Sequence, residues 1–334
     1  MATIAFVGTG GTISNAGTGA NDYINYLDSG RVLDTAAVLV MHPHLDELAT
    51  LEPVPFGQLR SKQISVQDWF RLARVTQAEL DKPDIDAVVI THGTGLLEET
   101  AYFLHLVLAT TKPVVLVGAQ RPPNTVGSDA QLNLLDAVRV AVNPQAAGLG
   151  VLVVMNRQIH SARDVTKRAN HDLAAMQSPV AHELGTITVD GKLRVTRTPQ
   201  TRHTHRSEFV LPLLSEAEEL PRVDVVYAHA QADGTAVEAF VNAGAKGLVT
   251  IGFPPGTNPP GLDEALDAAA AAGTVVVQAS RAWDEPAVAW RGSLQKRGFL
   301  ACSDVTPQHA RILLQLCLSK GLSHSEIRRV FTQY

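Results

Sequence analysis

Residues 4–13 read Ile4-Ala5-Phe6-Val7-Gly8-Thr9-Gly10-Gly11-Thr12-Ile13 and join an apolar run to a glycine-rich loop. The four apolar residues at the start are typical of a buried strand. Glycine occupies three of the next four positions, which permits a positive φ and a close approach of the backbone to a ligand. Thr12 follows this loop. We therefore expect its hydroxyl at the carboxyl end of a strand, where a fold of alternating strands and helices presents a nucleophile.

Two other interpretations of this stretch are open. One is a dinucleotide-binding loop of the form G-x-G-x-x-G, but counting from Gly8 and Gly10 the third glycine falls on Ile13. The other is a tight turn with no chemistry, which these ten residues alone do not exclude. The rest of the chain has to decide between them.

The pattern of an apolar run followed by polar residues recurs along the first half of the chain. Strands are predicted at 86–90, 112–118 and 150–155, and helices at 65–80, 97–108 and 132–142. Alternating strands and helices predict parallel βαβ units and an open twisted sheet, with ligands bound at the carboxyl ends of the strands. The polar residues that this topology collects at that edge are Thr12, Thr94, Gln120, Arg121 and Lys167.

The length of 334 residues is enough for two domains of ordinary size. We predict an N-terminal α/β domain at 1–195, a polar linker at 196–221 and a second α/β domain at 222–334. His203 and His205 fall in the predicted linker without a carboxylate or thiol pattern beside them. A solvated linker is therefore favoured there over a metal site.

Composition narrows the function classes. Hydrophobic residues make up 45% and charged residues 18% of the chain, which is typical of a globular protein. The net charge is −5 and no long basic run occurs, so neither nucleic acid nor a membrane surface is a predicted partner. The two cysteines suffice for neither a disulfide framework nor a zinc site. No leader or membrane-spanning pattern is visible, and a cytoplasmic location is expected.

Four motifs occur in a fixed order: Thr9-Gly-Gly-Thr-Ile13, Thr91-His-Gly-Thr94 with Glu98-Glu-Thr-Ala-Tyr-Phe-Leu104, Gly118-Ala-Gln-Arg-Pro122, and Arg163-Asp-Val-Thr-Lys167. With them the chain closely resembles the bacterial L-asparaginase family, from about Ile4 to Tyr334. The resemblance implies an α/β fold with a larger N-terminal flavodoxin-like parallel-sheet domain and a smaller C-terminal α/β domain. It also implies a homotetramer, a dimer of dimers, whose active sites are shared between subunits.

The activity implied by the resemblance is hydrolysis of a small carboxamide, L-asparagine or a close analogue, to a carboxylate and ammonia, with no cofactor and no metal. The implied catalytic residues are the nucleophile Thr12, the lid residue Tyr26 that helps to deprotonate it, and the hydroxyl–base pair of Thr94 and Lys167. Tyr23 is an alternative lid tyrosine. A lysine base requires burial that brings its pKa well below the free value of ~10.4. The implied substrate-binding residues are Ser61, Lys62, Gly93, Gly95 and Gln120.

The chain departs from the family pattern around the substrate ammonium group. Gly95 stands where the family has an aspartate that binds this ammonium, and Lys62 adds a positive charge nearby. The place of a glutamate lent by a neighbouring subunit falls near Arg291. We therefore hold open an amide, lactam or imide substrate without a free α-amine. The conservative alternative is an L-asparaginase whose ammonium site uses Asp284 or Glu285.

A second class of function is a non-catalytic relative that only binds a small molecule. The presence of Thr12, Thr94 and Lys167 together argues against it, because a site without chemistry has no need of all three.

Overall fold

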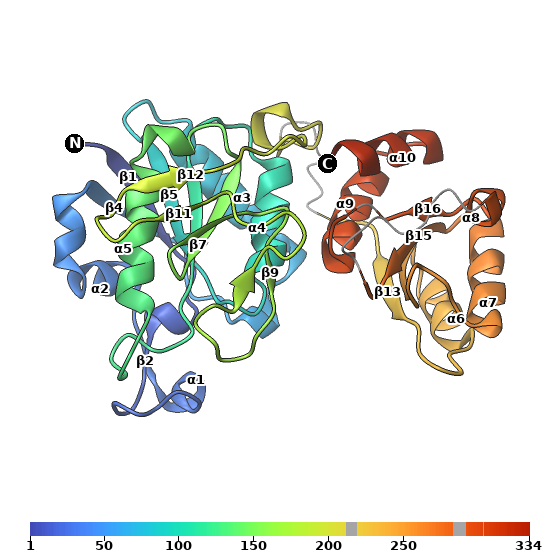
Figure 1. The fold of residues 1–334 in the computed structure, drawn as a ribbon, viewed down its shortest axis with the longest axis horizontal. Coiled ribbons are helices and arrows are strands. Elements are labelled where there is room, and N and C mark those ends of the chain that lie inside the picture. Colours follow the sequence, from blue (N-terminus) through green and yellow to red (C-terminus); the bar gives the residue numbers. More distant parts are fainter. Residues whose placement is uncertain (212–218, 283–291, 303) are drawn as a thin grey trace. The chain divides into compact units, whose positions relative to one another are not determined.

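The computed structural model describes residues 1–211, 219–282, 292–302 and 304–334 (Figure 1). The chain divides into two compact units, Met1–Leu213 and Leu214–Tyr334. Each unit is built around its own sheet and is described by itself.

The first unit contains an eight-stranded sheet. Its parallel strands are β1 (Thr3–Gly8), β4 (Thr50–Pro55), β5 (Ala87–Thr91), β6 (Val114–Val117) and β7 (Val151–Met155). The remaining strands are β8 (Gln158–Ser161), β11 (Gly185–Ile187) and β12 (Leu193–Val195). The order β12-β11-β8-β7-β6-β5-β1-β4 contains the flavodoxin-like run β4-β1-β5-β6-β7, which confirms the predicted fold class.

The sequence predicted a parallel sheet, whereas the observed sheet also contains antiparallel strands. From β7 onward neighbouring strands pair antiparallel. The physical reason is the connection between β7 and β8, where only Asn156 and Arg157 separate the strands, with φ of 49° and 61°. A two-residue turn with both φ values positive closes an antiparallel hairpin and is far too short for a parallel crossover.

Helices separate the parallel strands in sequence. They are α2 (Thr35–Val40), α3 (Val66–Leu80), α4 (Leu97–Val107) and α5 (Ala130–Ala141). Every residue of β5, β6 and β7 is buried, as expected for strands covered on both faces. Trp69 of α3 is also buried. Its Nε1 donates to Thr100 Oγ1 of α4 at 3.0 Å, and its ring stacks on Phe103.

Short elements complete the first unit. They are η1 (Thr12–Ser14), β2 (Asn15–Ala16), α1 (Tyr26–Ser29), β3 (Arg31–Val32), η2 (Pro43–Glu47), η3 (Ser61–Gln63), η4 (Pro144–Ala146), β9 (Thr166–Lys167), β10 (Met176–Gln177) and η5 (Thr204–Arg206). The pairs β2–β3 and β9–β10 are separate two-stranded sheets.

The second unit contains a four-stranded parallel sheet, as predicted for a smaller α/β domain. Its strands are β13 (Val223–Tyr227), β14 (Gly247–Gly252), β15 (Val275–Ser280) and β16 (Leu300–Ala301), and its helices are α6 (Thr235–Asn242), α7 (Pro260–Ala271), α8 (Gly292–Lys296), α9 (Pro307–Ser319) and α10 (His324–Gln333). Both cysteines, Cys302 and Cys317, are buried in this unit.

The solvated-linker prediction is wrong for His203. This residue has no exposed surface, and its ring lies 4.9 Å from the ring of His105 on α4. Arg206 Nη2 donates to His203 Nε2 at 3.0 Å, and burial lowers the pKa of His203 to about 4. A neutral imidazole packs like an aromatic ring, and Gly150 leaves room for both rings because a Cβ there would clash with them. His205, by contrast, is exposed as predicted.

Candidate active site

Two glycine loops meet where β1 and β5 end. Gly10 and Gly11 have φ of 99° and 88°, which only glycine adopts readily. A Cβ at Gly11 would clash with the backbone of Gly93 in the loop after β5. Thr9 Oγ1 donates to Thr91 O at 2.7 Å and ties the two loops together. Glycine is therefore required for the close approach of the segments that carry Thr12 and Thr94.

The sequence offered two tyrosines, Tyr26 and Tyr23, as partners of Thr12, and Thr12 contacts one of them. The hydroxyls of Thr12 and Tyr26 are 2.7 Å apart, and each residue is 8% exposed. Tyr23 instead donates its hydroxyl to Val126 O at 3.0 Å, so Tyr26 is the tyrosine that reaches Thr12. Burial raises the pKa of Tyr26, an effect that the hydrogen bond with Thr12 opposes. The phenol is therefore neutral near pH 7.

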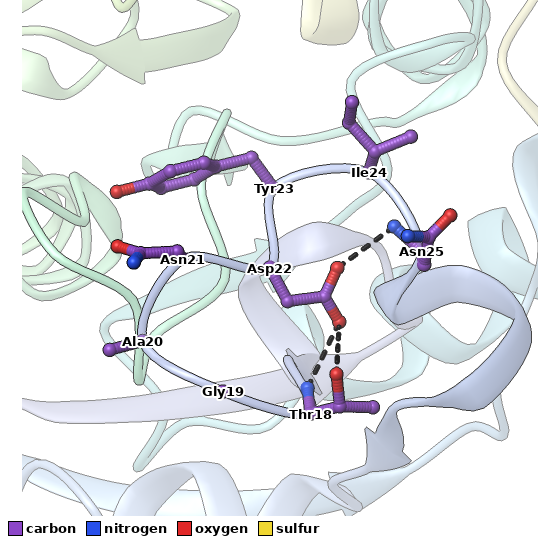
Figure 2. Close-up of a pocket in the computed structure, with 8 residues that line it drawn as sticks. All are labelled: Thr18, Gly19, Ala20, Asn21, Asp22, Tyr23, Ile24 and Asn25. Atoms are coloured by element: carbon purple, nitrogen blue, oxygen red, sulfur yellow. Dashed lines mark hydrogen bonds between the residues drawn. The ribbon is translucent and has the colours of Figure 1, made fainter.

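Residues 17–26 form a compact loop that ends at Tyr26, the first residue of α1, and we name this segment the lid. Figure 2 shows how Asp22 organises it: the carboxylate accepts hydrogen bonds from Thr18 N and Thr18 Oγ1, both at 3.0 Å, and from Asn25 N at 2.9 Å. These bonds lower the pKa of Asp22, with the Thr18 backbone making the largest contribution. Tyr26 is the last residue of the lid, so these hydrogen bonds bear on where its phenol lies.

The lid is fastened to a second loop, residues 121–128. Gly17 N donates to Asn124 Oδ1 at 2.7 Å, and Asn124 Nδ2 donates back to Gly17 O at 2.8 Å. Val126 N donates to Ala20 O at 2.9 Å. Segments more than 100 residues apart in sequence are thus joined by backbone groups, the Asn124 amide and the Tyr23 hydroxyl.

Thr94 and Lys167 form a second pair. The sequence placed both residues at the carboxyl edge of one sheet, but Lys167 lies on β9, which belongs to a separate two-stranded sheet. Lys167 Nζ donates to Thr94 Oγ1 at 2.8 Å, and Thr94 is 6% exposed. Burial lowers the pKa of Lys167, while the negative charge of Glu98 opposes that shift. A lysine with a lowered pKa is a better proton acceptor near neutral pH.

Glu98 interacts with this pair, although the sequence showed it only as part of the motif that follows Thr94. Its Oε2 accepts the backbone N–H of Lys167 at 2.7 Å. Its position four residues after Thr94 is visible in the sequence. The contact spans 69 residues, however, and no local pattern predicts it.

His92, within the same motif as Thr94, has a structural position. It is 1% exposed, and its Nδ1 lies 2.9 Å from Gly93 O. Since a carbonyl only accepts, Nδ1 carries the proton. Burial lowers the pKa of His92 to about 4, so the ring is neutral near pH 7.

Ser61 lies beside the Thr94 loop. A Cβ at Gly95 would stand 3.4 Å from Ser61 Cβ and 3.6 Å from Ser61 Oγ, and a Cβ at Gly93 would clash with the same hydroxyl. Ser61 therefore faces both glycines. Leu59 N donates to Thr9 O at 2.8 Å and holds this turn against the first loop. Lys62, the next residue, is exposed.

Gln120 lies at the end of the next strand. Its backbone N–H donates to the carboxylate of Asp129 at 3.0 Å. Its side-chain Nε2 is buried and has no hydrogen-bond partner within the described part of the chain. A buried donor without a partner is costly, and a ligand carbonyl would satisfy it.

Three residues considered for the ammonium site, Asp284, Glu285 and Arg291, lie outside the described residues. Over the described ranges, no group of three or more His, Cys, Asp or Glu side chains has the arrangement of a metal site. In the same ranges, every helix is too short or too polar to cross a membrane.

Comparison with known proteins shows which family the chain resembles. Residues 3–201 match the family model "Asparaginase, N-terminal" and residues 222–331 match "Glutaminase/Asparaginase C-terminal domain". The chain is 36% identical to "L-asparaginase 2" of Escherichia coli over 100% of its own length and 94% of that protein. It is 35% identical to "Glutaminase-asparaginase" of Pseudomonas fluorescens, covering 100% of this chain and 91% of that protein.

A solved structure gives the same answer. The probable cytoplasmic L-asparaginase of Campylobacter jejuni superposes with a TM-score of 0.90 at 33% identity, with 100% of both chains covered. The two family models match in chain order, and the relatives and the solved structure match over nearly the full length of both chains. The chain therefore belongs to the asparaginase family, whose members are hydrolases acting on an amide C–N bond.

Proposed function

We propose that the chain hydrolyses the side-chain amide of L-asparagine or a close analogue, with Thr12 as the nucleophile. Thr12 Oγ1 attacks the amide carbon and gives its proton to the Thr94–Lys167 pair. The pair passes this proton to the amide nitrogen, the C–N bond breaks, and ammonia leaves. Water then attacks the acyl-threonine ester, and the carboxylate product departs. The observation that carries this proposal is the pair of buried hydroxyls, Thr12 and Thr94, each within 2.8 Å of a titratable partner on adjoining glycine loops.

The two pairs have different roles in this proposal. Tyr26 has a raised pKa, so its phenol holds its proton in the resting site and acts as a hydrogen-bond partner and relay for Thr12. Lys167 has a lowered pKa and is the better proton acceptor, working through the hydroxyl of Thr94. Proton uptake therefore falls to the Thr94–Lys167 pair, and orientation of the nucleophile to Tyr26.

Substrate binding is assigned to the residues around Ser61. The Ser61 hydroxyl and backbone groups of Gly93 and Gly95 bind the substrate carboxylate, with Lys62 adding positive charge. The unpartnered Nε2 of Gln120 supports a place for it beside a substrate carbonyl. Backbone N–H groups of the glycine loops stabilise the oxyanion, a contribution of a few kcal/mol per donor in typical hydrolases.

A relaxed requirement for the α-ammonium group is a second candidate. Gly95 has no carboxylate to pair with an ammonium, although its surroundings leave space for a side chain. Lys62 is an exposed cation close by. Both features favour an amide, lactam or imide without a free α-amine over the binding of L-asparagine by a conventional ion pair.

The proposal extends to assembly and location. We include in the proposal a homotetramer, built as a dimer of dimers with shared sites, and a cytoplasmic location like that named for the Campylobacter jejuni protein. A solution mass four times the 35.7 kDa of the chain, measured by light scattering, supports the tetramer. A monomer mass with full activity contradicts the shared sites.

The activity is tested by ammonia release from L-asparagine, D-asparagine, L-glutamine and succinamate, with product analysis for cyclic imides and lactams. Thr12→Ala is expected to lower turnover at least a thousandfold, while Thr188→Ala, a threonine of the β11–β12 hairpin, leaves it unchanged. Turnover that survives Thr12→Ala refutes the nucleophile. No turnover on any substrate, with ligand binding retained, favours the non-catalytic binding protein.

A further inference from the structure

We propose that Glu98 is a positioning residue that holds Lys167 against Thr94 and sets the charge state of its ammonium group. This inference rests on the proposed function, because it concerns the base of the Thr94–Lys167 pair. It adds a carboxylate at the start of α4 to the residues that govern this pair.

Lys167 needs such a contact because of where it lies. It belongs to β9, which within the described part of the chain pairs with β10 in a two-stranded sheet separate from the eight-stranded one. The sheet that places Thr94 therefore does not by itself place Lys167. A short hairpin of two residue pairs needs contacts outside itself to have a fixed position.

Glu98 and Thr94 together accept hydrogen bonds from the backbone and the side chain of Lys167. The backbone N–H of Lys167 donates to Glu98 Oε2 at 2.7 Å, and its side-chain Nζ donates to Thr94 Oγ1 at 2.8 Å. Both acceptors come from one segment, the loop after β5 and the first turn of α4. The separation between base and hydroxyl is thus fixed by a stretch of five residues, 94–98.

The side chain of Thr94, which accepts from Lys167 Nζ, is itself closely packed. A Cβ at Gly118 would lie 2.8 Å from Thr94 Cγ2 and 2.9 Å from His92 O, so the backbone of Gly118, the residue after β6, packs directly on the Thr94 side chain. Thr94 cannot move toward β6 to follow a displaced lysine. A shift of the β9 hairpin would therefore lengthen the hydrogen bond between Nζ and Oγ1.

The charge of Glu98 matters as well as its position. Burial lowers the pKa of Lys167, and among the described residues Glu98 is the charged group that acts in the opposite direction. Thr94, facing the ammonium from the β5–α4 loop, and Met176, paired with Lys167 on β10, are uncharged. Gly95 adds no carboxylate. Glu98 thus keeps the lysine able to take up a proton and hold it during the reaction.

The test separates charge from position with three variants. Glu98→Gln keeps an oxygen acceptor but removes the charge. Glu98→Asp keeps the charge but retracts the acceptor. Glu99→Gln is the matched control, because it removes a charge from the adjacent residue of the same helical turn.

The first readout is the rate at which a small acylating reagent modifies Lys167, followed by peptide mass spectrometry as a function of pH. Glu98→Gln is expected to move the titration of Lys167 about one pH unit toward acid, while Glu99→Gln leaves it in place. An unchanged titration in Glu98→Gln overturns the electrostatic role.

The second readout is the pH profile of kcat/KM. Its acid limb is expected to move to lower pH in Glu98→Gln, while Glu98→Asp lowers kcat at least tenfold with its acid limb unmoved. Wild-type kcat in Glu98→Asp overturns the positioning role. The labelling does not require turnover, so a protein that hydrolyses no amide but shows the shifted titration rejects the proposed function and retains the inference about Glu98.

Discussion

Placing a carboxylate at residue 95 is the sharpest perturbation that the site offers. Gly95 is exposed and its φ lies outside the left-handed region, so a side chain there is unstrained. The Cβ would meet Ser61 at 3.4 Å, an ordinary contact distance. Gly95→Asp is therefore expected to fold and to direct its carboxylate toward the place assigned to the substrate carboxylate and α-carbon.

The size of the effect follows from Coulomb's law. A carboxylate about 5 Å from an ammonium gains roughly 3 kcal/mol at an effective dielectric constant of about 20, and less where water reaches the pair. Because residue 95 is exposed, we expect about 1–2 kcal/mol, a factor of roughly 5–30. This gain applies to L-asparagine, which carries the ammonium, and not to succinamate, which lacks it.

The assay compares kcat/KM for the two substrates in the wild type, in Gly95→Asp and in the neutral isostere Gly95→Asn. The ratio of L-asparagine to succinamate is expected to be near one in the wild type and to rise only in Gly95→Asp. A wild-type ratio above a hundred, or an equal rise in Gly95→Asn, refutes the reasoning. Either result would mean that the ammonium is bound by other groups or that the new side chain acts through its shape.

Three further predictions concern the lid and the buried histidines. Tyr26→Phe is expected to lower kcat at least tenfold because Thr12 loses its 2.7 Å partner, and wild-type kcat would contradict this; Tyr23→Phe is the control, with less than a threefold loss. Asn124→Ala removes two hydrogen bonds to Gly17, worth about 1 kcal/mol each, so limited proteolysis within the lid should accelerate about thirtyfold and KM should rise; an unchanged cleavage rate would show that the lid does not depend on this amide. The free energy of unfolding, from denaturant titrations, should fall as the pH drops from 6.5 to 4. The buried histidines His92 and His203 have pKa values of about 4 in the folded chain, whereas unfolded histidine takes up a proton near 6.5; a flat profile would contradict this.

The fold was largely predictable because its signals are local. Unbroken apolar runs predicted the buried strands β1, β5 and β7, and glycine-rich loops marked the carboxyl ends of β1 and β5. The antiparallel edge of the sheet was not predicted. Its strands are short, and the turn at Asn156 and Arg157 needs a positive φ at both residues although neither is a glycine.

The candidate site divides in the same way. The sequence by itself indicated that Thr12 and Thr94 follow strands at one edge of a sheet, because parallel strands present their carboxyl ends together. Lys167 lies on β9, outside that sheet, so its place beside Thr94 was decided by the tertiary structure. Only the tertiary structure decided between Tyr26 and Tyr23. The two tyrosines lie three positions apart, and the sequence does not reveal which hydroxyl points toward Thr12.

Long-range contacts were likewise beyond the sequence. Glu98 reaches Lys167 across 69 residues, Asn124 reaches Gly17 across 107, and His203 packs beside His105 in a segment that composition marked as solvated. Local sequence carries backbone preference and hydrophobic period, which are properties of neighbours along the chain. Which side chain satisfies a distant N–H, or fills the space above a glycine, is decided by the packing of the whole unit, and only the tertiary structure contains it.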